Sequence, residues 1–333
     1  MAGGTTTAAL ALAVQGAGGF AFAAGGYKDA QALADHLAPL RAAGGDFGVN
    51  LFVPPTVPPD AHLRLTLDRY REELAATAAE YGVEVPSEEL AFEDPLVQDF
   101  YLDKVQLLVA EPVPVVSFTF GLPGRDVVSA LHRAGSAVVL SVTSVAEARA
   151  AADAGADALV VQHSNAGGHT AAFMPTEPAT ATLGLPGLLT AVRSAVGLPL
   201  VAAGGIGDPP SARAALDAGA AAVQLGTALL RTDESGARAI HKDALADPWF
   251  TETAMTAAFT GKPARALVNR FLLRHTPQAP RAYPEVHFLT APLRAAAAAA
   301  GDPEGLNLWA GTQWRNARSG PAAAVVREFL DEL

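Results

Sequence analysis

The sequence lacks cysteine, and its 333 residues include only eight histidines, three tryptophans and three methionines. The absence of cysteine excludes disulfides, thiolate nucleophiles and cysteine-bound zinc or iron–sulfur centres. A chain without cysteine suits a reducing compartment, and we predict a cytoplasmic protein. The spacing of histidine, aspartate and glutamate matches no metal-ligand pattern, so no metal is predicted.

Positive charge is also scarce. The chain has 23 lysines and arginines against 34 aspartates and glutamates, a formal net charge of −11, and it has no basic run. This balance argues against a nucleic-acid surface. Glycine, proline or charge interrupts each apolar stretch before it reaches the length of a membrane span. Residues 1–26 lack the basic start and the continuous apolar centre of a signal peptide. We expect a soluble protein that acts on a small molecule.

What the chain does contain is an alternation of short apolar runs with amphipathic segments rich in alanine and leucine. Runs that are apolar throughout are typical of parallel strands covered by helices on both faces. Helix signals fall between the runs: Ser144 with Glu147 forms a capping-box pattern, and Asp208 with Pro209 precedes a helix that Gly219 ends. The predicted strands are residues 19–24, 47–53, 114–120, 137–142, 157–162, 199–204 and 221–226. Such repeated units predict an α/β fold, either a doubly wound sheet or a (β/α)₈ barrel.

Two regions break the alternation. Residues 54–98 are bounded by prolines and contain one long amphipathic stretch, which predicts a helical insertion. Residues 231–320 lose the alternation and predict a smaller, mostly helical domain or lid. Residues 321–333 are amphipathic and are predicted to return to the barrel as its last helix. The barrel with its insertion then spans residues 1–230.

Two successive predicted strands end in glycine and lead into a helix start, at Gly204–Gly205 and at Gly226–Thr227. In (β/α)₈ barrels the loops after the last two strands commonly bind phosphate, and glycine lets backbone N–H groups approach it. One such turn would indicate only a tight turn, whereas two on neighbouring strands favour a barrel with a phosphate site. The glycine-rich segment 16–26 follows no strand and has no acidic partner at the required distance, so a dinucleotide fingerprint is excluded.

Five segments together resemble the nitronate monooxygenase family, formerly called 2-nitropropane dioxygenases. They are GVNLFVP (48–54), VVSFTFGLP (115–123), VVQHSNAGGHTAAF (160–173), AAGGIGDPPSARAALDAGAAAVQLGTALL (202–230) and AFTGKPARALVNRF (258–271). The resemblance extends over nearly the whole chain. It implies an FMN-containing (β/α)₈ TIM barrel.

The resemblance also assigns cofactor contacts residue by residue. Asn50 and Gln162 match residues that contact the flavin, and the glycine loops match the FMN phosphate site. Gln224 lies in a predicted strand, where burial of an unpartnered amide is costly, so we interpret it as partnered by a ligand. The positions carried over as cofactor-binding are Met1, Asn50, Gln162, Gly167, Gly168, Gly204, Gly205, Gln224, Leu225, Gly226 and Thr227.

His169 occupies the position of the family's active-site histidine, in the AGGH motif. An imidazole with its ordinary pKa of about 6.5 can accept a carbon-bound proton or, when protonated, hold an anion. Because Gly167 and Gly168 have no side chains, the backbone can pass close beneath a flavin and direct His169 over it. His163 directly follows Gln162, and we interpret it as a surface residue that is close to dispensable.

The sequence departs from the common family pattern in two places. His163, Asn165, Thr170 and Ala171 stand where the family has Gly, Glu, Arg and Gly, and the missing Glu and Arg leave the identity of the substrate open. The family equivalent of Met1 follows the first barrel strand. The resemblance therefore implies either that the start was assigned late or that another segment closes the barrel, because an open barrel has two unpaired edges.

The resemblance implies an FMN-dependent nitronate monooxygenase. Such an enzyme oxidises an alkyl nitronate, for example propionate 3-nitronate, with dioxygen to a carbonyl compound and nitrite. Three alternatives stay open: an FMN-dependent NAD(P)H reductase of the enoyl-ACP or quinone reductase type, a barrel isomerase or synthase for a sugar phosphate, and a flavin-binding protein without catalysis. The expected partners are the nitronate and dioxygen, and a homodimer is a candidate assembly.

Overall fold

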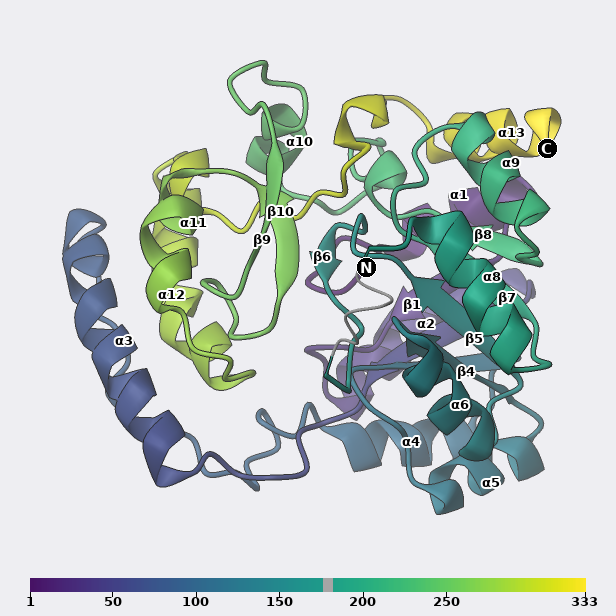
Figure 1. Cartoon of the computed structure of the whole chain (residues 1–333), viewed down its shortest axis with the longest axis horizontal. Coiled ribbons are helices and arrows are strands. Elements are labelled where there is room, and N and C mark those ends of the chain that lie inside the picture. Colours follow the sequence, from purple (N-terminus) through teal and green to yellow (C-terminus); the bar gives the residue numbers. More distant parts are fainter. Residues whose placement is uncertain (176–181) are drawn as a thin grey trace.

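The computed structural model describes residues 1–175 and 182–333 and shows a mixed α/β protein around a curled sheet (Figure 1). The strands lie in the order β1-β2-β3-β4-β5-β7-β8, and each neighbouring pair is parallel. All seven predicted strands are present. They are β1 (Ala21–Ala24), β2 (Phe47–Phe52), β3 (Val115–Thr119), β4 (Ala137–Val142), β5 (Ala158–Gln162), β7 (Leu200–Ala203) and β8 (Ala222–Gln224).

Helices cover the outer face of this sheet, and the main apolar core lies between the two layers. Two of the predicted helix starts are confirmed: Ser144 accepts a hydrogen bond from the N–H of Glu147, and Asp208 forms a reciprocal capping box with Ser211. Such caps satisfy N–H groups that the first helical turn leaves free. The helices are α1 (Ala8–Gly16), α2 (Ala30–Ala43), α4 (Tyr101–Ala110), α5 (Arg125–Ala134), α6 (Val145–Asp153), α8 (Leu185–Ala195), α9 (Pro209–Asp217) and α13 (Ala322–Glu332).

The sheet curls without closing. β1 and β8 are its edge strands, and no strand in the described parts of the chain pairs with their outer edges. The prediction of a TIM-barrel arrangement is therefore confirmed for the parallel sheet and its outer helices, while the sheet has seven strands instead of the eight of a complete barrel. Val139, Val160 and Ala203 pack together on the concave inner face.

A second unit stands beside the C-terminal ends of the strands (Figure 1). Its antiparallel sheet has the order β6-β10-β9, formed by β6 (Gly168–His169), β10 (Ala264–Leu267) and β9 (Thr253–Thr256). Its helices are α3 (Ala61–Glu80), α10 (Ala239–Ala244), α11 (Arg270–His275) and α12 (Glu285–Ala299). The sequence predicted a mostly helical region here, because strands of two to four residues are too short to show a period.

The insertion and the C-terminal region share one apolar core. Leu67, Tyr70 and Leu74 of α3 pack against residues of α11 and α12, and Figure 1 shows the three helices side by side. The Tyr70 hydroxyl donates to the carbonyl of Ala258 at 2.7 Å. This shared core could not be predicted from the sequence, because nothing in either region indicates the other as its partner.

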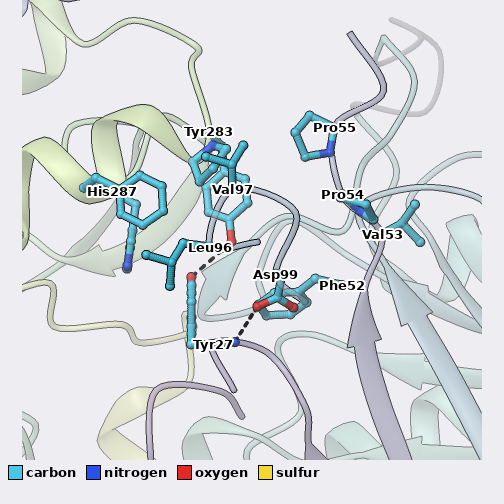
Figure 2. Close-up of a pocket in the computed structure, with 12 residues that line it drawn as sticks. Tyr27, Phe52, Val53, Pro54, Pro55, Leu96, Val97, Asp99, Tyr283 and His287 are labelled. Carbon is cyan, nitrogen blue, oxygen red and sulfur yellow. Dashed lines mark hydrogen bonds between the residues drawn. The ribbon is translucent and has the colours of Figure 1, made fainter. Parts of the chain in front are cut away.

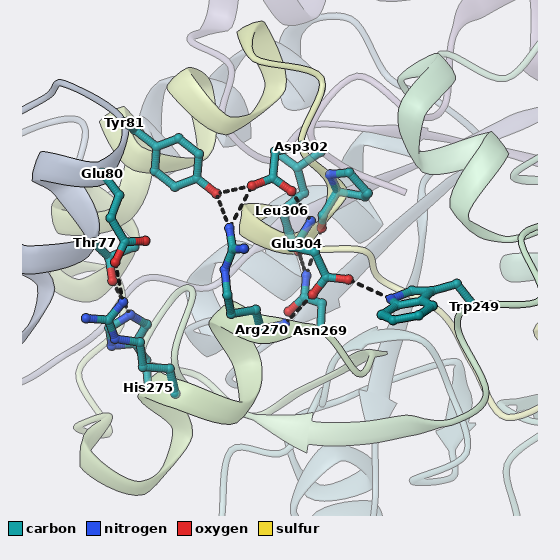
Figure 3. Close-up of polar contacts among 12 residues, drawn as sticks. Thr77, Glu80, Tyr81, Trp249, Asn269, Arg270, His275, Asp302, Glu304 and Leu306 are labelled. Carbon is teal, nitrogen blue, oxygen red and sulfur yellow. Dashed lines mark hydrogen bonds and ion pairs between the residues drawn. The ribbon is translucent and has the colours of Figure 1, made fainter.

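Polar contacts connect the end of α3 to the rest of this unit (Figure 3). Asp302 accepts hydrogen bonds from Tyr81 at 2.7 Å and from Arg270 at 2.8 Å. The buried ring of His275 pairs with Thr77 of α3 at 2.9 Å. Within the described ranges, no helix is both long and apolar enough to cross a membrane.

Candidate functional site

The candidate site lies where the C-terminal ends of the parallel strands meet the second unit. The chain leaves β5 at Gln162 and turns through residues 163–167, then pairs with β10 as β6, opposite Ala264 and Arg265. Thr170 extends this pairing by donating to the carbonyl of Pro263 at 2.8 Å. His169 is therefore held between the curled sheet and the second unit.

Two glycines make this placement possible. Gly168 has a φ of +75°, a left-handed conformation that side chains disfavour. A Cβ on Gly167 would lie 2.5 Å from the backbone nitrogen of Gly311, which is too close for any side chain. A close contact within the protein thus requires Gly167, and the backbone conformation favours glycine at position 168, whether or not a flavin lies nearby.

Gln162 fixes the segment that carries His169. Its Nε2 donates to the carbonyl of His169 at 3.1 Å, and its Oε1 accepts from the N–H of Ala171 at 2.7 Å. The amide thus braces the backbone on both sides of the histidine ring. The resemblance implied a flavin contact for Gln162, and the structure gives this side chain a positioning role.

Aromatic rings enclose His169. The centroid of its ring lies 5.7 Å from Phe120, 5.9 Å from Tyr283 and 5.2 Å from Trp309. Its Nε2 lies 2.9 Å from the hydroxyl of Thr260, which donates its own proton to the carbonyl of Lys262. His169 therefore donates from Nε2 and keeps Nδ1 as an acceptor, for which the described residues provide no donor.

His169 is neutral at physiological pH. Burial lowers its pKa to about 3, and the positive charges of Lys262 and Arg294 add to this effect. The burial of the ring therefore favours a neutral His169 over a protonated one that holds an anion. A neutral imidazole of such low basicity is also a weak acceptor for a carbon-bound proton.

His163 has a structural role. Its Nδ1 accepts from the N–H of Asn165 at 3.2 Å, so its Nε2 donates to the carbonyl of Leu183 at 2.9 Å. The ring is half-buried. The interpretation as a surface residue is wrong, because both ring nitrogens bind the backbone of neighbouring segments.

The two predicted phosphate loops lie at neighbouring strand ends. Gly204 and Gly205 pack against the turn at residues 163–166, and a Cβ on Gly204 would lie 2.6 Å from the carbonyl oxygen of His163. The Thr227 hydroxyl accepts from the N–H of Gly311 at 3.0 Å. Among the described residues, nothing accepts a hydrogen bond from the backbone N–H of Gly205 or Gly226. Free N–H groups on two adjacent loops are what an anion such as phosphate requires.

The remaining predicted contacts are spread along the same edge of the sheet. Asn50 donates to the hydroxyls of Ser117 and Thr119 at 2.9 and 3.0 Å, which leaves its Oδ1 as an acceptor. A Cβ on Gly226 would lie 3.9 Å from the Sδ of Met1, so this methionine is close to the second loop. Of the other predicted contacts, Leu225 packs against the main core and Gln224 ends β8.

The structure contradicts the predicted burial of Gln224. It is exposed at the end of the edge strand β8. Because its amide is not buried, it carries no desolvation cost that a ligand would have to offset. The prediction that Gln224 is buried is wrong, since the edge position of β8 was not visible in the sequence, and its contact with a cofactor stays a prediction.

A small hollow lies between the end of β2 and the start of α12 (Figure 2). Its walls include Tyr27, Phe52, Tyr283 and His287. The Tyr283 hydroxyl donates to that of Tyr27 at 3.3 Å, and the ring of Tyr27 stacks on His287. Tyr283 lines this hollow and also packs against His169, so its ring connects the hollow to the site.

The sequence did not indicate a role for Phe120, directly after β3, or for the residues that the second unit contributes, which are Thr260, Lys262, Tyr283 and Trp309. Thr260 and Lys262 fall in a segment that carried the family resemblance, but no rule of spacing connects them to His169, about ninety positions earlier. Only the β6–β10 pairing brings them together.

The fold and the site define a class of protein: an α/β-barrel-like enzyme with its site at the C-terminal edge of a parallel sheet, where barrel enzymes keep their chemistry. The profile of the family described as nitronate monooxygenase matches residues 1–332. A probable nitronate monooxygenase of Staphylococcus aureus (strain Newman) is 33% identical over 338 residues, which cover 99% of this chain and 92% of that protein. The chain therefore belongs to the nitronate monooxygenase family and is a flavin-dependent oxidoreductase.

Solved structures agree with this assignment. The chain is similar to nitroalkane oxidase from Streptomyces ansochromogenes, with 47% identity, a TM-score of 0.93 and coverage of 100% of this chain and 93% of that one. It is also similar to FabK from Thermotoga maritima, with 25% identity, a TM-score of 0.74 and coverage of 100% and 90%. The likeness thus extends over the curled sheet and the second unit together.

Proposed function

We propose that the protein is an FMN-dependent nitronate monooxygenase that oxidises alkyl nitronates, such as propionate 3-nitronate, with dioxygen to a carbonyl compound and nitrite. The observation that carries this proposal is the ammonium of Lys262, which lies 4.5 Å from the centroid of the Phe120 ring that packs against the buried, neutral ring of His169. A neutral nitroalkane must first lose a carbon-bound proton, for which a weakly basic imidazole is poorly suited. A nitronate has already lost that proton and carries the negative charge.

The residues at the sheet edge fit FMN. The free N–H groups of Gly205 and Gly226 would bind its phosphate, and Thr227 and the Oδ1 of Asn50 offer further polar contacts. When bound, FMN supplies the redox chemistry that no side chain here can perform. Met1, Gly167 and Gly168 lie along the same edge and complete the proposed cofactor site.

The chain's own residues orient the substrate and exclude water. Phe120, Tyr283 and Trp309 surround His169 with apolar surface, which keeps the local dielectric low and strengthens charge interactions there. Thr260 fixes the ring so that Nδ1 is available as an acceptor. His169 is thus the proposed catalytic residue, acting as a neutral hydrogen-bonding group.

Steady-state kinetics with purified, FMN-loaded protein tests the proposal. We expect kcat/KM for freshly prepared ethylnitronate or propionate 3-nitronate to exceed that for nitroethane at least tenfold, with oxygen consumption and nitrite release. A preference for nitroethane would contradict the choice of substrate. Rapid anaerobic bleaching of the flavin by NADH, without a response to nitronates, would favour the NAD(P)H reductase instead.

A further inference from the structure

Lys262 places an ammonium group beside His169 without a carboxylate partner. Its Nζ lies 4.5 Å from the centroid of the Phe120 ring and donates to the carbonyl of Ala172 at 3.0 Å. An ammonium has three N–H donors, and among the residues that the structure describes only one of them has an acceptor. No carboxylate of the described residues forms an ion pair with Lys262.

Phe120 holds this ammonium next to the site. Its ring contacts the ammonium and packs edge-on against His169. The residue directly follows β3 and has a φ of +80°, a conformation that costs a non-glycine residue energy and that occurs mainly where function requires it. The strained backbone therefore directs an aromatic surface under a cation, in contact with the proposed catalytic ring.

The residues around Lys262 do not neutralise its positive charge. Arg294 donates to Thr290 and His287 and also lowers the pKa of His169 through its charge. The carboxylate that acts on Lys262 is Glu147, and backbone N–H groups and a hydroxyl already occupy both of its oxygens. Two cations thus face an enclosure whose histidine is neutral, which is a setting for an anionic ligand.

We propose that Lys262 binds the charged oxygen atoms of the substrate and thereby selects nitronates over neutral nitroalkanes. This inference rests on the proposed function, and it names the residue that recognises the substrate's charge. A hydrogen bond from an ammonium to an anionic oxygen is stronger than one to a neutral nitro group. Lys262 therefore discriminates between two molecules that differ by one proton.

The proposal has a pH dependence with a definite sign. Burial lowers the pKa of Lys262 to about 8, while Glu147 raises it slightly. The ammonium is present below that pH and is lost as the pH rises through it. Because kcat/KM reports the free enzyme, its value for a preformed nitronate should decline above about pH 8. His169 stays neutral over this pH range and therefore adds no further step to the pH profile of kcat/KM.

Substitution of Lys262 tests the proposal with FMN-loaded protein. Lys262→Met keeps an unbranched side chain, shorter by one heavy atom, and removes its charge. We expect KM for ethylnitronate to rise about 10- to 100-fold, KM for nitroethane to change less than twofold, and the decline above pH 8 to disappear. Lys262→Arg should restore most of the nitronate affinity. Lys242→Met is the matched control, because Lys242 also donates to one backbone carbonyl, that of Thr232.

A binding measurement separates this inference from the proposed function. Nitrate is a planar anion that the enzyme does not oxidise, and calorimetry gives its Kd without turnover. Weaker nitrate binding by Lys262→Met supports the anion role even if nitronates prove not to be substrates. Unchanged nitrate and nitronate affinity overturns it. Loss of FMN from Lys262→Met, with nitrate binding retained after reloading, also overturns it, since Lys262 would then serve the cofactor.

Discussion

The two sides of the site are made of different groups. The sheet side presents glycines, backbone N–H groups and side-chain amides, at the ends of strands that repeat along the chain. The side of the second unit presents aromatic rings, a threonine hydroxyl and the cations Lys262 and Arg294, on segments without a repeat. We therefore expect the ends of the repeated strands to bind the phosphate-bearing cofactor and the irregular segments to select the substrate that reacts beside it. His169 lies on the short strand that joins them.

The largest effect is expected on the sheet side, at Gly204. A Cβ there would lie 2.6 Å from the carbonyl oxygen of His163, in a backbone with a φ of +98°. Gly204→Ala should displace the turn at residues 163–166 and with it the brace of His169. We expect a loss of stability of more than about 3 kcal/mol and a protein that no longer retains flavin after gel filtration.

Gly135 supplies the control for this prediction. Its φ of +91° is nearly the same, and a Cβ there would meet nothing within 4 Å. Gly135→Ala should therefore cost only the conformational strain, about 1–2 kcal/mol, and should retain flavin fully. Equal flavin loss in both variants would mean that backbone strain alone, and not the contact with residues 163–166, explains the result.

A smaller effect is expected at the junction, where the two histidines can be compared directly. His169→Asn removes a ring from the aromatic enclosure together with its hydrogen bond to Thr260. We expect kcat/KM for nitronates to fall about 10- to 100-fold. His163→Asn removes contacts to the backbone only, so its kcat/KM should change less than twofold while stability drops by about 1 kcal/mol.

The same pair of variants tests whether His169 acts as a base. With a pKa of about 3 it should produce no step in the pH profile of the wild-type enzyme between pH 5 and 8. His169→Asn should then affect nitronate and nitroethane alike. If it abolished only nitroethane turnover, by the ~10²–10⁴-fold typical of a lost general base, the neutral hydrogen-bonding role would be wrong.

This contrast between the two sides also explains what could be predicted from the sequence. All seven parallel strands were found because continuous apolar runs bounded by glycine and helix caps are local signals. His169 and its two glycines were indicated by the resemblance to the family, which a short contiguous motif, AGGH, carries. Lys262, Tyr283 and Trp309 carry no local signal, since the pairing of β6 with β10 and the packing of separate segments bring them to the site. The low pKa of His169 likewise arises from burial by those segments.

The smallest effect is expected in the second unit, away from the site, where a buried hydrogen bond and an exposed ion pair are among the contacts that attach α3. The Tyr70 hydroxyl is buried against the carbonyl of Ala258, two residues before Thr260. Tyr70→Phe leaves that carbonyl without a partner and should cost about 1–2 kcal/mol.

Arg274 pairs with Glu80 at 2.7 Å, with both side chains more than 40% exposed. Arg274→Met should cost only about 0.2–1 kcal/mol, because water and salt screen such pairs. Thermal unfolding of both variants at low and high salt measures the difference, and only Arg274→Met should become closer to wild type as salt increases. A larger loss from Arg274→Met than from Tyr70→Phe would mean that charge, and not the shared apolar core, holds the insertion against the C-terminal region.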